Sequence, residues 1–344
     1  MAKPVLQALQ GKKTATTPIW LMRQAGRYLP EYRKVRAQAK DFLNLCYSPE
    51  LAAEVTMQPI RRFGFDAAII FADILLVPDA LGQKVWFEES HGPRLEALDG
   101  TRAIGQLSID RIVPHLAPVY DAIARVRAQL DPDVALIGFA GAPWTVATYM
   151  CEGGGSSDQA AARAWAYRDS IGFGQLMDVL VEATITHLKA QVDAGADVLQ
   201  LFDTWAGALD EAGFAQWCIA PAKSIVSALK AEFPKVPIIG FPRGAGARLH
   251  AYVRETGVDG IGLDSGVPLD MARRFLQPHA CVQGNLDPLR LVAGGAAMHS
   301  QVHAILDAFA ERPFIFNLGH GIVLQTPLEH VEALVKLVRD KKAS

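Results

Sequence analysis

The sequence predicts an α/β fold built as a single (β/α)8 barrel of the TIM type. First, short apolar stretches that end in Gly, Asp or Pro recur along the chain, and each precedes a longer segment of helical pattern. Second, most of these stretches are continuously apolar, which is typical of strands buried on both faces of a parallel sheet. Third, no linker, charge run or repeat divides the 344 residues, so we expect one domain over 1–344. A doubly wound open sheet is the alternative fold.

Each expected strand is one of the short apolar stretches described above. They cover residues 18–22, 67–74, 135–141, 197–204, 236–244, 260–266, 280–287 and 314–321. The first stretch is also compatible with an N-terminal extension of the barrel rather than a barrel strand. Segment 82–98 reads as a β-hairpin inserted after a strand, and the mouth of the barrel is one place where it would fit.

Helix boundaries can be predicted for part of the chain. Ser48-Pro49-Glu50 predicts the start of a helix that runs to about Phe63. Segment 176–192 has apolar residues at i, i+3 and i+4, and Gly195 lies just past its expected end. The sequence 326–329 has the form of a capping box with proline at the first helical position, and it predicts the start of the last helix. Basic residues near the far end of that helix complement its dipole.

The composition argues against several classes of protein. Hydrophobic residues make up 50% of the chain and the mean hydropathy is +0.14, so the chain can bury a large core and is not globally disordered. The formal net charge of −2 argues against binding nucleic acid or a membrane through a generally basic surface. The four cysteines lie far apart without a CxxC, unlike a disulfide scaffold or a zinc ribbon. Without an export signal or an 18-residue apolar run, we expect a cytoplasmic protein.

In a (β/α)8 barrel the active site is built from residues just after the strands. Here those residues form a polar ring that contains arginines and carboxylates but no lysine. The ring consists of 23–27, Asp73, 142–144 with Tyr149, 203–204, 242–243, Asp264, 285–287 and 319–321. The lack of a lysine argues against Schiff-base or pyridoxal phosphate chemistry. No P-loop or dinucleotide-binding fingerprint occurs either.

Arg23 and Arg27 are the most informative members of this ring. If their segment is helical, two guanidinium groups four residues apart lie close together, which is costly without an anionic partner. A solvated basic face is the common explanation of such a pair. Because the apolar residues Trp20, Leu21 and Met22 precede them, we interpret the two arginines as a clamp for carboxylates.

Two further motifs carry little functional signal. The run Gly153–Ser157 lacks a lysine, and it is either a lid or a plain surface loop. His279 and Cys281 have the spacing of metal ligands, but they precede the apolar core of their strand and no cysteine follows. We therefore interpret Cys281 as a buried thiol beside a surface histidine and predict no metal site.

Several blocks in order along the chain resemble uroporphyrinogen decarboxylases. They are 18–33 (PIWLMRQAGRYLPEYR), 71–75, 138–150, 201–207, 240–246, 283–288 and 317–322. RQAGRYLPEYR and NLGHG are specific signals of this family when they occur together with the other blocks. The resemblance runs from about residue 3 to 340. It implies a (β/α)8 barrel that acts as a homodimer in haem synthesis. It also implies conversion of the four acetate side chains of uroporphyrinogen III to methyl groups, giving coproporphyrinogen III and CO2, without metal or organic cofactor.

The resemblance also assigns roles to residues of the ring. Contacts with the tetrapyrrole substrate are implied for Arg23, Gln24, Ala25, Gly26, Arg27, Asp73, Tyr149, Thr204 and His320. Of these, Asp73, Arg27, Tyr149 and His320 are the expected catalytic residues. The chemistry agrees, because arginines bind the carboxylates of such a substrate and a carboxylate can accept hydrogen bonds from its pyrrole N–H groups.

Each assignment has a structural alternative. Asp73 could cap a helix, Tyr149 could be part of the core, and His320 could be a structural histidine between two glycines. Two alternatives exist for the function as well. One is a zinc-dependent cobamide methyltransferase of the same barrel superfamily, against which the incomplete set of metal ligands counts. The other is a tetrapyrrole-binding protein without catalytic activity.

Overall fold

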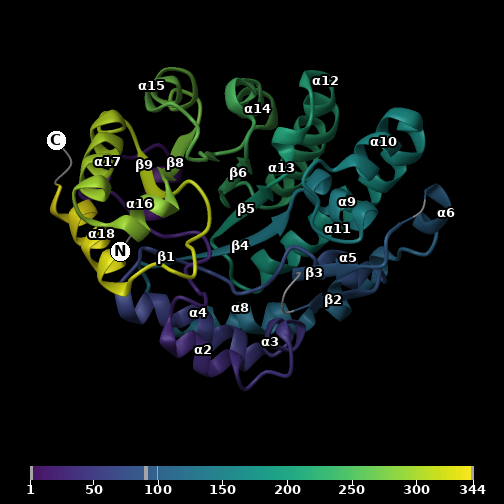
Figure 1. Cartoon of the computed structure of the whole chain (residues 1–344), viewed down its shortest axis with the longest axis horizontal. Helices are drawn as coiled ribbons and strands as arrows, with labels where there is room; N and C mark the ends of the chain where they lie inside the picture. Colours follow the sequence, from purple (N-terminus) through teal and green to yellow (C-terminus); the bar gives the residue numbers. More distant parts are fainter. Residues whose placement is uncertain (1–2, 89–91, 99, 342–344) are drawn as a thin grey trace.

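The computed structural model describes residues 3–88, 92–98 and 100–341, and it contains a curled parallel sheet wrapped by helices (Figure 1). The strands of this sheet pair in the order β1-β4-β5-β6-β7-β8-β9, and every pair is parallel. Their bounds are β1 (Ala67–Ile69), β4 (Ala135–Gly141), β5 (Val198–Asp203), β6 (Ile238–Pro242), β7 (Gly260–Gly262), β8 (Cys281–Leu286) and β9 (Phe314–Leu318). The strand order follows the chain order, as in a barrel and not as in a doubly wound sheet.

The stretch 18–22 lies between the two edges of this sheet. Ile19 forms a parallel bridge with Phe316 of β9, and the N–H of Phe316 donates to the carbonyl of Pro18 (2.8 Å). On its other side, the N–H of Ile19 donates to Oδ2 of Asp66, and the N–H of Asp66 donates back to the carbonyl of Ile19 (2.8 and 2.9 Å). The stretch therefore occupies the eighth position of the barrel, between β9 and β1, although it is bonded too briefly to form a named strand.

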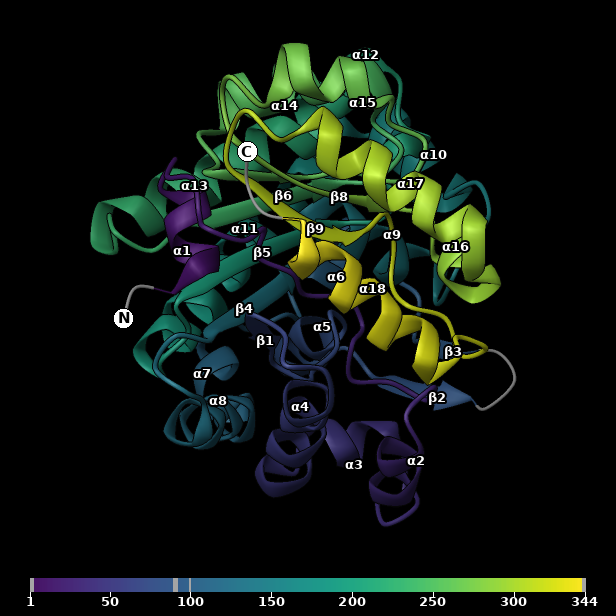
Figure 2. The ribbon, with the colours of Figure 1, turned by 90° about the vertical axis from the view of Figure 1, so that its left-hand side faces the viewer.

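Helices cover the outside of the sheet in both ribbon views (Figures 1 and 2). The longer ones are α4 (Pro49–Phe63), α8 (Ala117–Gln129), α9 (Pro143–Glu152), α10 (Ala160–Arg168), α11 (Ser170–Asp193), α13 (Ala220–Glu232), α14 (Leu249–Thr256), α17 (Gly295–Ala308) and α18 (Leu328–Asp340). The shorter ones are α1 (Pro4–Leu9), α2 (Pro30–Arg36), α3 (Phe42–Cys46), α5 (Leu76–Leu81), α6 (Thr101–Ile104), α7 (Ile112–His115), α12 (Glu211–Phe214), α15 (Leu269–Met271) and α16 (Pro288–Ala293). No described helix is long and apolar enough to cross a membrane.

Helix α1 packs at the N-terminal end of the strands, which leaves the opposite end of the barrel as its mouth. Lys3, just before α1, forms an ion pair with Asp197 directly before β5 (2.5 Å). At the start of β7, a Cβ on Gly260 would lie 2.7 Å from Leu9 of α1, so the absence of a side chain at Gly260 makes room for this helix.

Polar side chains cross the inside of the barrel. Nε1 of Trp20 donates to Gln283 of β8 (2.9 Å), and Nε2 of Gln283 donates to Gln200 of β5 (3.3 Å). Because these groups meet from separate strands, Gln200 and Gln283 face the barrel interior. Residues two positions further along each strand face the same way.

The predicted helix over 48–63 is confirmed, and so is the helix predicted over 176–192. Helix α4 begins at Pro49 and ends at Phe63, where Gly64 takes the left-handed conformation with φ 64°. Helix α11 contains 176–192 but starts earlier than the apolar pattern, at Ser170. It can start there because the side chain of Asp169 accepts a hydrogen bond from the N–H of Gly172 (2.8 Å).

The predicted capping box at 326–329 is wrong. Helix α18 starts at Leu328, and the residue that flanks it is Pro327 in an extended conformation. Thr326 therefore lies one residue too early to cap, and its buried hydroxyl has no hydrogen-bond partner among the described residues. Arg339 does lie in the last turn of α18, as predicted for the helix dipole.

The predicted hairpin over 82–98 is confirmed within its described part, from which residues 89–91 are excluded. Strands β2 (Val85–Glu88) and β3 (Gly92–Leu95) are antiparallel. The hairpin packs on α3, where the rings of Phe87 and Phe42 have centroids 4.6 Å apart. It also pairs with the start of the Gly153–Ser157 run: the N–H of Leu95 donates to the carbonyl of Gly153, and Arg94 bridges Gly154. That run is thus part of a paired structure at its beginning rather than a free loop tip.

Candidate active site

The segment after the eighth barrel position carries Arg23 and Arg27 to the mouth. The segment is a series of turns, with Arg23 in the left-handed region (φ 61°), so the helical spacing considered for the two arginines does not apply. Both side chains are exposed, and neither has a hydrogen bond or ion pair within the described chain. They are therefore free to bind an anion.

Gln24 holds this segment against the barrel. It is completely buried, its Oε1 accepts a hydrogen bond from the N–H of Leu21, and its Nε2 donates to the carbonyl of Ala67 in β1 (3.1 and 3.0 Å). The side-chain amide is thus committed to the fold, and so are the backbone groups: the N–H of Gln24 donates to the carbonyl of Leu21 and its carbonyl accepts the hydroxyl of Tyr28 (3.0 and 2.8 Å). Its neighbours Ala25 and Gly26 are half-buried at the mouth.

His320 and Gly321 follow β9 and lie beside Arg23. A Cβ on Gly321 would come within 2.4 Å of Cδ of Arg23, so only glycine allows the arginine to lie across this turn. Nδ1 of His320 accepts a hydrogen bond from the N–H of Gly321 (2.6 Å), which places the proton of the neutral ring on Nε2. Burial, with the charges of Arg23 and Arg243, lowers the pKa of His320 to about 4 against a smaller effect of Asp264. Near pH 7 His320 is therefore a neutral N–H donor.

Asp73 lies after β1 and is half-buried. Its Oδ1 accepts a hydrogen bond from the N–H of Leu75 (2.9 Å), whereas Oδ2 has no partner within the described chain. Helix α5 starts only at Leu76, so Asp73 stabilises the turn before it and is not its N-cap. Burial raises the pKa of Asp73, and the Leu75 N–H and the Arg23 charge offset part of this effect. One carboxylate oxygen is thus available at the mouth, near a guanidinium group.

Tyr149 on α9 is half-buried and close to the same carboxylate. Burial raises the pKa of its phenol, and the charge of Asp73 raises it further. Its ring lies 6.1 Å from the ring of Trp205, between centroids. Tyr149 therefore lies at the mouth as a protonated phenol, beside Asp73 and the strand end that carries Thr204.

Thr204 follows β5 and is half-buried. The residue before it, Asp203, is buried and accepts a hydrogen bond from the hydroxyl of Thr145 on α9 (2.5 Å). Burial raises the pKa of Asp203 to about 6, against the effects of Thr145 and of Cys218. Asp203 belongs to the polar ring predicted from the sequence, but its role could not be predicted, because only the contact with α9 shows what its carboxylate does.

Three phenylalanines form a row inside the barrel below this polar ring. The centroid distances are 5.6 Å from Phe139 of β4 to Phe202 of β5, and 6.0 Å from Phe202 to Phe241 of β6. They face the interior because Phe139 pairs with the inward Gln200, and Phe202 lies two residues further on and pairs with Phe241. Phe139 and Phe202 are only half-buried, so their rings offer an apolar surface to a ligand, whereas Phe241 is buried. This role was not predicted from the sequence, although each phenylalanine lies near the end of its strand.

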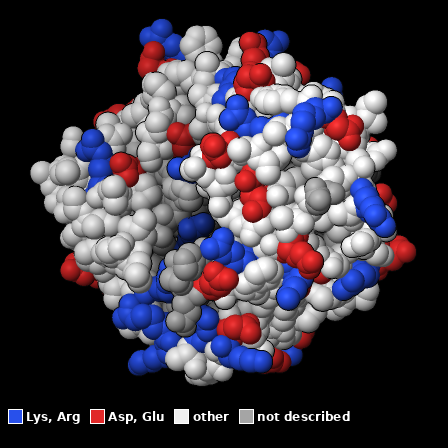
Figure 3. All heavy atoms as spheres, turned by 45° about the vertical axis from the view of Figure 1, so that its right-hand side comes forward, with Lys and Arg blue, Asp and Glu red and all other residues white. Residues whose placement is uncertain are grey.

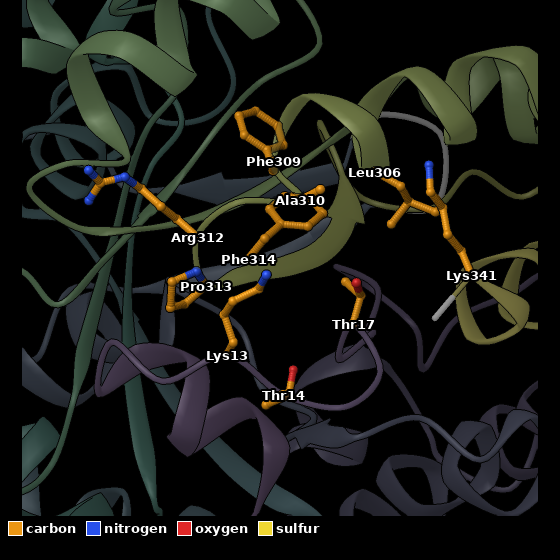
Figure 4. Close-up of a pocket in the computed structure, with 10 residues that line it drawn as sticks. All are labelled: Lys13, Thr14, Thr17, Leu306, Phe309, Ala310, Arg312, Pro313, Phe314 and Lys341. Atoms are coloured by element: carbon orange, nitrogen blue, oxygen red, sulfur yellow. The ribbon is translucent and has the colours of Figure 1, made fainter. Parts of the chain in front are cut away.

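One face of the molecule is hollowed, and Lys and Arg atoms lie at the floor of the hollow (Figure 3). A second, much smaller cavity of about 40 Å³ lies at the other end of β9, lined by Pro313, Phe314 and basic residues that include Lys13 (Figure 4). Lys341 at its edge forms an ion pair with Asp307, and the cavity is far too small for a tetrapyrrole. The predicted site residues gather at the mouth and not at this cavity.

The structure gives no sign of a metal site in its described ranges. No group of three or more His, Cys, Asp or Glu side chains there could hold a metal ion. Cys281 is buried and unpaired, and His279 is exposed, as the sequence predicted.

Comparison with known proteins places the whole chain in one family. The family described as uroporphyrinogen decarboxylase (URO-D) matches residues 1–341. The chain is 56% identical to the uroporphyrinogen decarboxylase of Sphingopyxis alaskensis, over 98% of both chains. It is 53% identical to that of Rhodospirillum rubrum, over 98% of this chain and 97% of the other.

Solved structures confirm the fold at low sequence identity. A methyltransferase from Methanosarcina mazei superposes with a TM-score of 0.81 at 19% identity, over 98% of this chain and 97% of the other. A B12-independent methionine synthase from Shewanella gives 0.59 at 11% identity, over 95% and 97%. These likenesses support the barrel fold and carry no argument about the reaction.

Proposed function

The chain belongs to the uroporphyrinogen decarboxylase family, and on this premise we propose that it converts the four acetate side chains of uroporphyrinogen III to methyl groups. The products are coproporphyrinogen III and four molecules of CO2, in haem and tetrapyrrole biosynthesis. The observation that carries this proposal is the match over residues 1–341, which includes every residue of the polar mouth.

The geometry of the mouth suits a tetrapyrrole with eight carboxylates. Arg23 and Arg27 are unpaired within the described chain and can each bind a carboxylate through two parallel hydrogen bonds. The half-buried rings of Phe139 and Phe202 can pack against the macrocycle. The free oxygen of Asp73 can accept hydrogen bonds from the pyrrole N–H groups at the centre of the ring.

The reaction needs an electron sink, and the substrate supplies it. Protonation of a pyrrole ring carbon next to the acetate-bearing carbon makes the ring cationic. The bond from the acetate methylene to its carboxylate then breaks, CO2 leaves, and the electron pair forms an exocyclic double bond. A second proton adds to the former acetate methylene carbon, at the end of this double bond, to give the methyl group. The ring carbon that was protonated first then loses its proton. Each round consumes one proton overall and needs neither a metal nor an organic cofactor.

The protein's part is to place charges around this cation. The carboxylate of Asp73 can stabilise the positive ring, and the electrostatic effect is strengthened in a half-buried site. The neutral Nε2–H of His320, the phenol of Tyr149 and the hydroxyl of Thr204 serve as donors that orient carboxylates. The residues that act on the reacting group are Asp73, Arg27, Tyr149 and His320. The other residues expected to contact the substrate bind and orient it.

The assembly and its location complete the proposal. Residues 1–344 fold as one domain, and two copies form a homodimer in the cytoplasm with their mouths near the interface. The family resemblance supports this assembly. Sedimentation at micromolar concentration measures the mass, and a fully active monomer would contradict the dimer.

The decisive experiment is anaerobic incubation with uroporphyrinogen III, followed by oxidation and chromatographic counting of the carboxyl groups. Products with seven, six, five and finally four carboxyls support the proposal. A tetrapyrrole-binding protein without activity would leave all eight. A zinc-dependent methyltransferase would lose its activity on chelation, whereas we expect decarboxylation to survive both chelation and carbonyl-trapping reagents.

A further inference from the structure

Arg243 lies just after β6 and continues the inward-facing side of that strand. Phe241, two residues earlier, belongs to the row of phenylalanines inside the barrel. The N–H of Arg243 donates to the carbonyl of Asp203 (3.0 Å), which extends the β5–β6 ladder by one step. A residue in this register projects on the same side of the sheet as Phe241, toward the mouth.

The loop that carries Arg243 is held firmly. The N–H of Gly207 donates to the carbonyl of Arg243 (3.0 Å), and the N–H of Gly244 donates to Oδ2 of Asp264 (2.8 Å). A Cβ on Gly207 would lie 3.0 Å from the carbonyl oxygen of Gly244, so the two loops touch backbone to backbone. The backbone of Arg243 is therefore fixed from three sides.

The guanidinium group of Arg243, in contrast, has no hydrogen bond or ion pair with any described residue, although the side chain is half-buried. The carboxylate of Asp264 forms no ion pair with it, and the two oxygens of Asp264 accept the N–H groups of Gly244 and Gly266 (2.8 and 2.9 Å). An arginine without a counter-charge at the mouth of a site for an octacarboxylate is available for that ligand.

The position of Arg243 relative to the other arginines gives it a distinct task. The eight barrel positions run from 18–22 through β1, β4, β5, β6, β7, β8 and β9. Arg23 and Arg27 follow 18–22 and Arg243 follows β6, four positions away in a ring of eight, so they stand on opposite sides of the mouth. The carboxylates of a porphyrinogen ring its edge, and a macrocycle held at one edge by Arg23 and Arg27 presents other carboxylates to the opposite wall.

We propose that Arg243 binds a peripheral carboxylate of the substrate, on the wall opposite Arg23 and Arg27, and thereby holds the macrocycle across the mouth. The inference rests on the proposed function. It is supported by His320, whose pKa is lowered by the charges of both Arg23 and Arg243, so both cations act at one site. The carboxylate is either an acetate, which the reaction removes, or a propionate, which it keeps.

The test compares Arg243→Gln with wild type and with Arg254→Gln. Arg254 is exposed on α14, the helix that follows β6, so this control removes one positive charge from the same βα unit. We expect KM for uroporphyrinogen III to rise about 10- to 100-fold in Arg243→Gln, because a charged hydrogen bond is lost from substrate and transition state alike. We expect kcat to change little, and Arg254→Gln to leave both constants unchanged.

A second substrate distinguishes the two kinds of carboxylate. A pentacarboxylate porphyrinogen has four propionates and a single acetate. If Arg243→Gln raises KM for this substrate as much as it raises KM for uroporphyrinogen III, the ligand of Arg243 is a propionate. A much smaller rise for the pentacarboxylate identifies an acetate.

Arg243→Lys is a control for misfolding of Arg243→Gln, since it keeps the positive charge and loses only the planar, bidentate geometry of the guanidinium group. We expect its KM to lie between those of wild type and Arg243→Gln. A KM within twofold of wild type in both variants would overturn the proposal, as would a fall in kcat at unchanged KM. Absence of turnover in the wild-type protein would instead refute the proposed function.

Discussion

The hydroxyl of Thr145 on α9 donates a 2.5 Å hydrogen bond to Oδ1 of Asp203 at the end of β5. The same hydroxyl accepts a hydrogen bond from the N–H of Trp205 (3.1 Å). Tyr149 lies one helical turn after Thr145, and Thr204 lies between Asp203 and Trp205. One buried pair therefore fixes the distance between two elements that each carry a residue of the mouth.

Asp203→Asn should change how stability depends on pH. Burial raises the pKa of Asp203 from 3.8 to about 6, so the folded state holds its proton more tightly than the unfolded state. The contribution of Asp203 to the stability of wild type therefore falls as pH rises from about 4 to 6, by roughly 3 kcal/mol if the whole shift is expressed. Asparagine does not titrate, so the melting temperature of the variant relative to wild type should rise across this window. A constant difference from pH 4 to 7 would contradict the raised pKa.

Asp73→Asn should lower kcat by orders of magnitude. Asparagine keeps the shape and one acceptor but removes the charge that stabilises the cationic ring, so the loss falls mainly on the transition state. Asp73→Glu should retain more activity, because the charge survives at a displaced position. Steady-state kinetics with uroporphyrinogen III measure both variants. Turnover close to wild type in Asp73→Asn would reduce Asp73 to the residue that holds the turn before α5.

Arg23→Lys and Arg27→Lys should each reduce kcat/KM by about tenfold or more, because lysine keeps the charge but loses the bidentate geometry. The matched control is Arg254→Lys, the same exchange at an exposed position outside the mouth, which should have no effect. Near-normal kinetics in both mouth variants would mean that the two arginines only solubilise the surface.

His320 should not titrate in the working range of the enzyme. Its pKa of about 4 keeps it neutral above pH 5 in the free enzyme, so the profile of kcat/KM against pH should have no inflection that His320→Asn removes. Since the unfolded histidine has the higher pKa, the contribution of His320 to stability should rise with pH between about 4 and 6.5, and the stability of His320→Asn relative to wild type should fall across this window. A wild-type inflection near pH 6.5 that disappears in the variant would show that His320 works as the imidazolium.

Much of the fold could be predicted because it is encoded locally. Apolar runs before Asp73 and Asp203 identify the strands β1 and β5, and the residues just after such strands lie at the mouth of a parallel barrel. The start of α18 was mispredicted because Pro327, and not Thr326, takes the flanking position. A four-residue motif can suggest an N-cap residue, but tertiary contacts decide which residue takes the N-cap position.

The rest of the site could not be predicted because it depends on contacts between distant residues. The turns around Arg23 are set by Gln24, whose side chain reaches β1, and not by the spacing of the arginines. The role of Asp203 depends on Thr145, which is 58 positions away in the sequence. The row of phenylalanines requires the register of three strands, which no single stretch of sequence contains.

The closure of the barrel by 18–22 has a consequence for protein synthesis. Ile19 leaves the ribosome early, but its bridge partner Phe316 is made almost last. Arg23 and Arg27 directly follow Ile19, so a growing chain carries both arginines long before β9 exists to hold their segment in place. A nascent or C-terminally truncated chain therefore holds the arginine segment through Asp66 and Gln24 but without β9, and we expect the pair to gain its full order, and its full affinity for a highly charged substrate, only when translation is nearly complete.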